Sequence, residues 1–280
     1  MNELKLPAWA ESASRAITVD GIETHYFELG SGPPLILIHG GGPGADSWGN
    51  WHGCLQEYAK NFRVIAYDMP GFGRSSKPSP ELYPYDQASR NRHLIGLIEA
   101  LKLAPVNLIG NSMGGATSLG VCIERADLVD KLILMGSAGL AVNNPDPGAK
   151  EILKQYDYTL GAMRAVMETL TGSRFKVEEH VLQYRHALMQ DPAAQAAIVR
   201  IVRSDLSYPE ERIASVTTPT LVVGGKEDKI AVPARNFRYL ELIENSWGFF
   251  IPHAGHWVML EAPKVFVGVT TKFLLENWAE

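Results

Sequence analysis

The fold is decided by one stretch of the chain, residues 106–115, which reads VNLIGNSMGG. Its apolar half predicts a buried strand, and the Gly-x-Ser-x-Gly that follows passes directly into a helical pattern. A sharp strand-to-helix turn strains its central residue and needs small neighbours, which Gly110 and Gly114 supply. We therefore interpret Ser112 as a nucleophile raised clear of a sheet. The Met113 N–H, at the start of the next helix, is placed to bind a negative oxygen.

Context has to support this motif, because 26 of the 280 residues are glycine and a bare Gly-x-Ser-x-Gly arises by chance in roughly one such chain in ten. Further apolar runs predict strands at residues 33–38, 64–67, 132–135, 220–223 and 247–251. Apolar residues at helical spacing predict helices at about 86–101, from the elbow to about 125, and at about 261–278. This alternation predicts an α/β fold with a mostly parallel sheet and helices on both faces.

Two segments depart from the alternation. Residues 16–19 and 22–29 are rich in β-formers and are separated by Asp-Gly, which predicts an antiparallel hairpin at the edge of the sheet. Residues 140–209 contain no strand-like run and show amphipathic helical stretches instead. We expect this segment to be a helical cap, inserted into an α/β core formed by residues 1–139 and 210–280.

The composition is that of an ordinary soluble protein. A net charge of −5 with interspersed acidic and basic residues makes nucleic acid an unfavourable partner. The N-terminus does not resemble a signal peptide, and no apolar stretch approaches the roughly 18 residues that span a bilayer. We therefore expect a cytoplasmic protein with no membrane partner. Cys54 and Cys122 lack metal-ligand spacing and are predicted to be buried thiols.

A serine hydroxyl becomes a good nucleophile only when a base takes its proton, and that base needs a carboxylate to orient it. Asp228 follows the predicted strand at 220–223, and His256 lies in PHAGHW, residues 252–257, after the last predicted strand. The carboxyl ends of the strands are where open α/β sheets keep their sites. The order Ser112, Asp228, His256 is that of the α/β-hydrolase fold.

Each of the last two residues has a competitor close by. Glu227 precedes Asp228, but the shorter aspartate side chain on a tight loop suits the role better, and Glu227 is consistent with a solvated face. His253 is the alternative to His256, and we interpret it as a local hydrogen-bonding residue.

The predicted strand at 33–38 ends in HGGGPGA, residues 39–45. Several glycines directly after a buried strand let the backbone approach a ligand and expose its N–H groups. The Gly-Lys-Ser/Thr of a phosphate-binding loop is absent from this segment.

Four segments together resemble the meta-cleavage product hydrolases, the C–C bond hydrolases of aromatic-ring degradation: residues 39–45, 48–50 (WGN), 110–115 and 255–257 (GHW). The resemblance covers essentially the whole chain, although the cap matches loosely. It implies the α/β-hydrolase fold and hydrolysis of a 2-hydroxy-6-oxohexa-2,4-dienoate to 2-hydroxypenta-2,4-dienoate and a carboxylic acid. It also implies a small-molecule substrate and no metal or organic cofactor. We further expect a homodimer or a higher homo-oligomer.

The resemblance also implies roles for individual residues. The N–H groups of Gly41 and Met113 would form the oxyanion hole. The residues expected to contact the dienoate are Gly42, Asn50, Asn111, Arg185 and Trp257, with Arg185 at the carboxylate end. Simpler interpretations exist for three of them: a solvated helix arginine for Arg185, helix capping for Asn50 and core packing for Trp257.

Cleaving a C–C bond requires the leaving carbanion to be delocalised, and the dienol meets this requirement after it ketonises. His256 can move the protons, while a fixed cation near the carboxylate would stabilise the developing charge. The residues leave open whether Ser112 forms an acyl-enzyme or helps water to form a gem-diol. Met163, Met167, Phe175 and the leucines of the cap offer an apolar wall that favours an aryl substituent at carbon 6.

Other functions are compatible with the same fold. A carboxylesterase or related serine hydrolase would use the same triad, but it would not need an arginine as a carboxylate anchor. A ligand receptor or inactive scaffold would not need an intact triad and oxyanion loop. Serine rather than aspartate at the elbow disfavours haloalkane dehalogenases and epoxide hydrolases.

Overall fold

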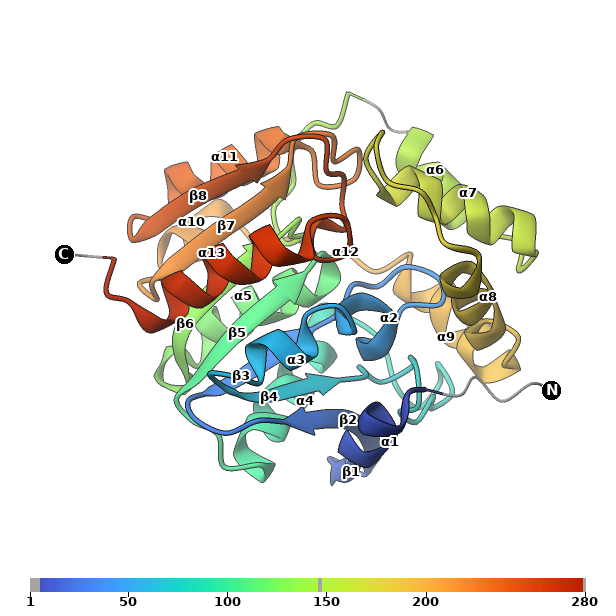
Figure 1. The fold of residues 1–280 in the computed structure, drawn as a ribbon, viewed down its shortest axis with the longest axis horizontal. Helices are drawn as coiled ribbons and strands as arrows, with labels where there is room; N and C mark the ends of the chain where they lie inside the picture. The colour runs from blue at the N-terminus through green and yellow to red at the C-terminus, as the bar shows by residue number, and fades with distance from the viewer. Residues whose placement is uncertain (1–5, 146–147, 279–280) are drawn as a thin grey trace.

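The computed structural model describes residues 6–145 and 148–278, which form an eight-stranded sheet with helices on both faces (Figure 1). The strand order is β1-β2-β4-β3-β5-β6-β7-β8. β1 pairs with β2 and β2 with β4 in antiparallel fashion, and the remaining pairs are parallel. The predicted fold class is therefore confirmed.

The strands are β1 (Ser14–Val19), β2 (Ile22–Leu29), β3 (Pro34–Ile38), β4 (Arg63–Tyr67), β5 (Val106–Asn111), β6 (Val129–Met135), β7 (Thr220–Gly225) and β8 (Ser246–Ile251). The helices are α1 (Ala8–Ala13), α2 (Ser47–Trp51), α3 (Leu55–Tyr58), α4 (Gln87–Ala100), α5 (Met113–Glu124), α6 (Gly148–Lys154), α7 (Leu160–Leu170), α8 (Glu179–Leu188), α9 (Pro192–Ile201), α10 (Glu210–Ala214), α11 (Pro233–Leu242), α12 (Val258–Glu261) and α13 (Pro263–Leu275), with a short 3₁₀ turn η1 (Ala126–Leu128).

The central strands are buried on both faces, which is why they read as continuous apolar runs in the sequence. Every residue of β5 and β7 is buried. The predicted hairpin is also confirmed. Asp20 and Gly21 both have positive φ, 50° and 79°, as the two central residues of a tight hairpin turn require. Cys54 and Cys122 are free and buried, and burial raises the pKa of each thiol to about 12.

The helices differ from the prediction in several places, and two of the differences have a clear physical reason. α11 was not predicted, because the face that it buries carries polar residues, Arg235 and Asn236, beside Tyr239. The predicted closing helix at 261–278 is shorter: α12 ends at Glu261, and α13 starts at Pro263, where a proline fits the first helical position.

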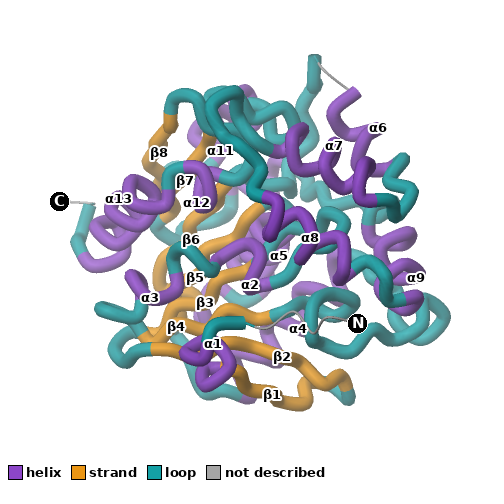
Figure 2. Tube along the Cα trace, turned by 45° about the vertical axis from the view of Figure 1, so that its right-hand side comes forward, coloured by secondary structure: helices purple, strands orange, loops and turns teal. Residues whose placement is uncertain are grey.

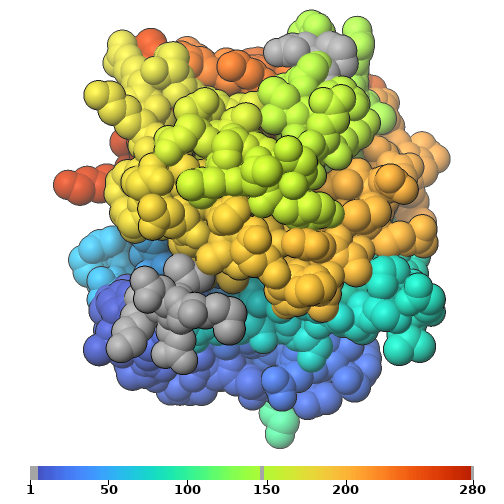
Figure 3. Space-filling model, turned by 90° about the vertical axis from the view of Figure 1, so that its right-hand side faces the viewer, coloured from blue at the N-terminus to red at the C-terminus, as the bar shows by residue number. Residues whose placement is uncertain are grey.

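The segment between β6 and β7 is helical, as its composition predicted. In residues 140–145 and 148–209, α6 to α9 are the regular elements and no strand occurs. These helices lie to one side of the sheet in Figures 1 and 2, and in Figure 3 their residues, green to gold, spread across one face of the molecule. No helix among the described residues meets the length and hydropathy that a membrane span requires.

Candidate active site

Ser112 stands at the turn between β5 and α5 with φ 54° and ψ −116°, a strained conformation for a residue with a side chain. The glycines around it are required by space. A Cβ on Gly110 would lie 2.4 Å from the Gly114 carbonyl oxygen, and one on Gly114 would lie 2.4 Å from the carbonyl oxygen of Ile38. The turn therefore has the geometry that the Gly-x-Ser-x-Gly motif predicts.

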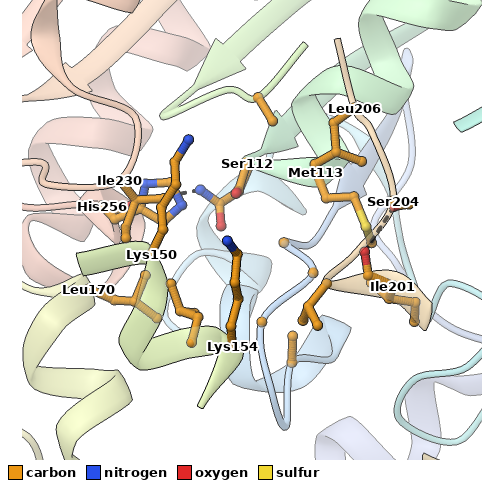
Figure 4. Close-up of a pocket in the computed structure, with 18 of the residues that line it drawn as sticks. Ser112, Met113, Lys150, Lys154, Leu170, Ile201, Ser204, Leu206, Ile230 and His256 are labelled. Atoms are coloured by element: carbon orange, nitrogen blue, oxygen red, sulfur yellow. Dashed lines mark hydrogen bonds between the residues drawn. The ribbon is translucent and has the colours of Figure 1, made fainter. Parts of the chain in front are cut away.

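Asp228 and His256 form a buried hydrogen-bonded pair beside this turn. The Nδ1 of His256 lies 2.8 Å from Oδ2 of Asp228, and the other carboxylate oxygen accepts the N–H groups of Ile230 and Ala231, each at 2.8 Å. A carboxylate on Nδ1 keeps the proton there and leaves Nε2 free to act as a base. His256 and Ser112 line the same cavity (Figure 4).

The two competing residues form a separate pair with each other. His253 Nδ1 lies 3.2 Å from Oε1 of Glu227, with side chains 45% and 32% exposed. The other Glu227 oxygen accepts the N–H of Ser173 at 2.7 Å. The structure therefore brings Asp228, rather than Glu227, to His256.

A partly buried carboxylate that the sequence analysis missed, Glu261, supports the His256 loop. Oε1 of Glu261 accepts the N–H groups of Gly255 and Trp257 at 2.9 and 3.3 Å, and Oε2 accepts the N–H of Gly172 at 2.7 Å. Burial raises the pKa of Glu261. The carboxylate thus ties the loop to the segment after α7. In the sequence, the only indication of this role is that Glu261 shortly follows the glycine-containing loop of His256.

The glycine-rich loop after β3 is held by His39. Its Nδ1 donates to the Gly40 carbonyl at 2.7 Å, and its Nε2 accepts the N–H of Met69 at 3.0 Å. Burial lowers the pKa of His39 to about 4, so the ring is neutral, as these two bonds require. Next to it, a Cβ on Gly41 would lie 2.6 Å from Sδ of Met113. Gly41, the residue of one predicted oxyanion donor, therefore packs directly against the side chain of Met113, the residue of the other.

Asn50 and Asn111 are buried and bonded to each other. Asn50 Nδ2 donates to Oδ1 of Asn111 at 3.1 Å, while Nδ2 of Asn111 points to the carbonyl oxygens of Met135 and His256 at 3.2 and 3.4 Å. Asn50 does not cap α2, because Asp46 does so by accepting the N–H of Gly49. Both asparagines line the cavity, as does Gly42.

Arg185 of α8 is 1% exposed and lines the same cavity. Its Nη2 donates to the Pro43 carbonyl at 2.8 Å, and its guanidinium lies 4.6 Å from the centre of the Trp257 ring. Its Nε and Nη1 have no hydrogen-bond partner among the described residues. Burial lowers its pKa to about 10, so the group is charged at neutral pH. A solvated helix arginine does not fit this environment.

A buried acidic network, which the sequence analysis also missed, adjoins Arg185. The Tyr184 hydroxyl donates a hydrogen bond to Asp46, which also accepts one from the Gly49 N–H at 2.6 Å. Burial, together with the nearby charge of Asp68, raises the pKa of Asp46 to about 7. Burial would also raise the pKa of Asp68, but hydrogen bonding to His25 and that ring's charge lower it to about 2.

The cavity between the sheet and the helical segment between β6 and β7 has a volume of about 370 Å³. The prediction of which apolar residues line the cavity is wrong in part. Met163 and Met167 are 0% and 1% exposed and do not line this cavity, and Phe175 lines a different hollow, whereas Leu153, Leu170 and Leu206 do line it. The side of α7 that carries the methionines is buried in packing. Within the described residues no group of three or more His, Cys, Asp or Glu side chains could hold a metal ion.

Comparisons with known proteins agree with this geometry. Residues 35–269 match the α/β hydrolase family. The chain is 42% identical to a 2-hydroxy-6-oxo-6-(2'-aminophenyl)hexa-2,4-dienoic acid hydrolase of Metapseudomonas resinovorans, over 95% of this chain and 92% of that protein. It is 32% identical to a 2-hydroxy-6-oxo-2,4-heptadienoate hydrolase of Pseudomonas putida, over 93% and 95%.

Solved structures give the same result. A serine hydrolase involved in carbazole degradation matches with a TM-score of 0.85 and 42% identity, over 93% of this chain and 98% of that one. A meta-cleavage product hydrolase mutant matches with a TM-score of 0.88 and 28% identity, over 95% and 100%. The chain therefore belongs to the α/β hydrolase family and, within it, to the meta-cleavage product hydrolases.

Proposed function

We propose that this protein hydrolyses the C–C bond of a 2-hydroxy-6-oxohexa-2,4-dienoate with an aryl group at carbon 6. The products are 2-hydroxypenta-2,4-dienoate and a carboxylic acid. The relatives named above for such dienoates support the substrate class. The chemistry uses no metal or organic cofactor.

In this proposal Ser112 is the nucleophile, His256 the base and Asp228 the carboxylate that orients it. The N–H groups of Gly41 and Met113 bind the oxyanion that forms at carbon 6. The Met113 N–H supports this role because it belongs to the first turn of α5, where N–H groups have no acceptor within the helix.

The observation that carries the proposal is the state of Arg185. A buried cation with two unbonded nitrogens is costly to maintain, and a carboxylate fits it because the guanidinium can donate two parallel hydrogen bonds. We assign Arg185 to the carboxylate end of the dienoate. Trp257 stacks against it, and Asn50, Asn111 and Gly42 complete the surroundings of the dienol.

The same arrangement accounts for the proton transfers. Ketonisation moves negative charge toward the carboxylate end, where Arg185 stabilises it. In this step the 2-hydroxyl group loses its proton and His256 delivers one to carbon 5; the ring then takes the proton of the nucleophile as the oxygen of Ser112 or of a water molecule adds to carbon 6. The carbon 5–carbon 6 bond then breaks, and its electrons pass through the carbon 3–carbon 4 double bond to the 2-oxo group, which takes up a proton to give 2-hydroxypenta-2,4-dienoate. Carbon 6 leaves as the carboxylic acid, whose second oxygen comes from water.

Other features of the proposal concern the whole protein. Residues 140–209 act as a cap over a core formed by residues 1–139 and 210–280. The protein works in the cytoplasm as a homodimer or higher homo-oligomer. Its partner is the small-molecule substrate rather than a membrane or nucleic acid.

The test compares kcat/KM for 6-phenyl, 6-(2-aminophenyl) and 6-methyl dienoates with kcat/KM for neutral 4-nitrophenyl esters. We expect the dienoates to be the better substrates by a factor of 100 or more, because esters lack the carboxylate that Arg185 binds. Higher values for the esters would show a carboxylesterase instead.

A further inference from the structure

A second group of cations lines the cavity apart from Arg185. The carboxylate whose charge acts on Arg185 is that of Asp46. Lys150 is instead affected by Arg235 and Lys154, and these three residues line the cavity as well. The cavity therefore holds two groups of positive charge, and the proposed function assigns a role to Arg185 alone.

Lys150 lies in the first turn of α6 and is partly buried. In the part of the chain that the structure describes, it forms no ion pair and no side-chain hydrogen bond. Burial, followed by the charges of Arg235 and Lys154, lowers its pKa. Figure 4 shows the side chains of Lys150 and Lys154 extending from α6 toward the part of the cavity with Ser112 and His256.

Arg235 lies in the first turn of α11 and is 6% exposed. Its Nη1 makes one long hydrogen bond, 3.5 Å to the carbonyl of Ile230, and its Nε has no partner among the described residues. The carboxylate whose charge reaches it is Asp228. That carboxylate already accepts hydrogen bonds from His256 and from two backbone N–H groups. Asp228 therefore does not pair with Arg235.

The other carboxylates near the cavity do not neutralise this group either. Glu151 binds Lys154 at 2.7 Å. Asp205 lines the cavity but is exposed and accepts the N–H of Ser207. Lys150 and Arg235 are thus two cations that line the cavity and form no ion pair with an acidic residue among those that the structure describes.

We propose that Lys150 and Arg235 form a cationic subsite for the carbon 6 substituent. The preferred substrates then carry a carboxylate or another oxygen acceptor on that substituent. This inference rests on the proposed function. In that function Arg185 binds the C1 carboxylate and Ser112 attacks carbon 6, so Lys150 and Arg235 are left to contact the substituent on carbon 6. An anion in the subsite restores the hydrogen bonds that the two cations lack.

The same geometry selects against two kinds of substituent. A plain phenyl or alkyl group leaves both cations without a partner, and an amino group offers hydrogen-bond donors to donors. This chain therefore differs in preference from its relative named for a 2'-aminophenyl dienoate.

The experiment measures kcat/KM for 6-aryl dienoates that differ only in the ortho group: carboxylate, hydroxyl, hydrogen or amine. We expect at least a tenfold preference for the carboxylate over hydrogen in the wild type, with the amine the poorest substrate. Lys150→Met should reduce the carboxylate preference about tenfold, Lys150→Arg should retain it, and Lys150→Glu should reverse the order of carboxylate and amine. Lys176→Met, which removes one exposed cap lysine, is the control for overall charge and should change no ratio.

Two outcomes overturn the inference: no carboxylate preference in the wild type, or the same preference in Lys150→Met. If the wild-type protein hydrolyses none of these dienoates, the proposed function is contradicted instead. The subsite is then tested with 4-nitrophenyl glutarate and 4-nitrophenyl valerate, whose acyl groups differ in a terminal carboxylate. A preference for glutarate that disappears in Lys150→Met supports the subsite, and equal rates for the two esters overturn it.

Discussion

Two buried charged groups act at the cavity, the Asp228 carboxylate through His256 and the Arg185 guanidinium directly, and they differ in how many of their hydrogen bonds are made. The Asp228 carboxylate accepts three hydrogen bonds, from His256 and from two backbone N–H groups of its own loop. Arg185 is equally buried, but two of its three nitrogens have no hydrogen-bond partner in the described chain. One centre is complete without a ligand, and the other is not.

This difference separates the tasks of the two centres. A base that must act in every turnover benefits from an orientation fixed in advance, because no reorganisation is then required at the moment of reaction. A binding residue left with unbonded donors gains most when the correct anion arrives and rejects molecules that lack one. We infer that the Asp228–His256 pair supplies the rate and Arg185 the selectivity.

Removing a member of the catalytic triad, which contains the Asp228–His256 pair, should have the largest effect. Ser112→Ala and His256→Ala should each lower kcat on dienoates by roughly 10⁴-fold or more, because the triad acts as a unit. Loss of the dienoate's visible absorbance measures the rate, and circular dichroism checks that the fold is retained. Near-wild-type turnover by Ser112→Ala would remove serine from the mechanism.

Removing the Arg185 guanidinium should have a smaller effect, and one that depends on the substrate. Arg185→Gln should raise the barrier for dienoates by about 2–4 kcal/mol, about 30- to 900-fold in kcat/KM, and change the hydrolysis of small neutral esters little. Arg185→Lys should be intermediate, since a lysine keeps the charge but loses the two parallel donors. Stopped-flow spectra should show slower ketonisation. Equal losses on both substrates would mean that Arg185 only supports the cap.

Removing the Glu261 carboxylate, which holds the His256 loop, should test whether the orientation of His256 matters. Glu261→Ala leaves the N–H groups of Gly172, Gly255 and Trp257 without their acceptor. We expect kcat to fall about tenfold with KM nearly unchanged, and the free energy of unfolding to fall by about 2 kcal/mol. Glu261→Gln retains an oxygen acceptor and should recover most of kcat. An unchanged kcat in Glu261→Ala would show that this carboxylate does not position His256.

The smallest expected effect concerns the charge beside Arg185. Asp46 has a pKa raised to about 7 by burial and by Asp68, so it becomes ionised as the pH rises through 7. Its negative charge then competes with the substrate carboxylate for Arg185, and KM for dienoates should rise about two- to fivefold between pH 6 and 8. Asp46→Asn keeps an acceptor for the cap of α2 but cannot ionise. The same rise in KM in this variant would exclude Asp46 as its cause.

The sequence predicted best what depends on local pattern. The buried strands could be predicted because both of their faces are buried, as in β5 and β7. The elbow could be predicted because only glycine fits two positions before and two positions after Ser112. Chain order then pointed to Asp228 and His256, which lie in a buried hydrogen-bonded pair.

Long-range polar contacts could not be predicted in this way. Glu261 binds Gly172, 89 positions away, and Tyr184 binds Asp46, 138 positions away, without any periodic signal. α11 was missed because it buries arginine and asparagine. The methionines of α7 were expected in the cavity wall but pack elsewhere, since residue type does not determine which face of a helix meets a ligand.

The central claim is C–C bond hydrolysis at Ser112, and product analysis tests it most directly. The purified protein is mixed with the 6-phenyl dienoate, and the products are identified as the visible absorbance decays. We predict one equivalent each of 2-hydroxypenta-2,4-dienoate and benzoate from the wild type, and neither product at a comparable rate from Ser112→Ala. Persistence of the dienoate with the wild type, or equal product formation by both proteins, would contradict the account.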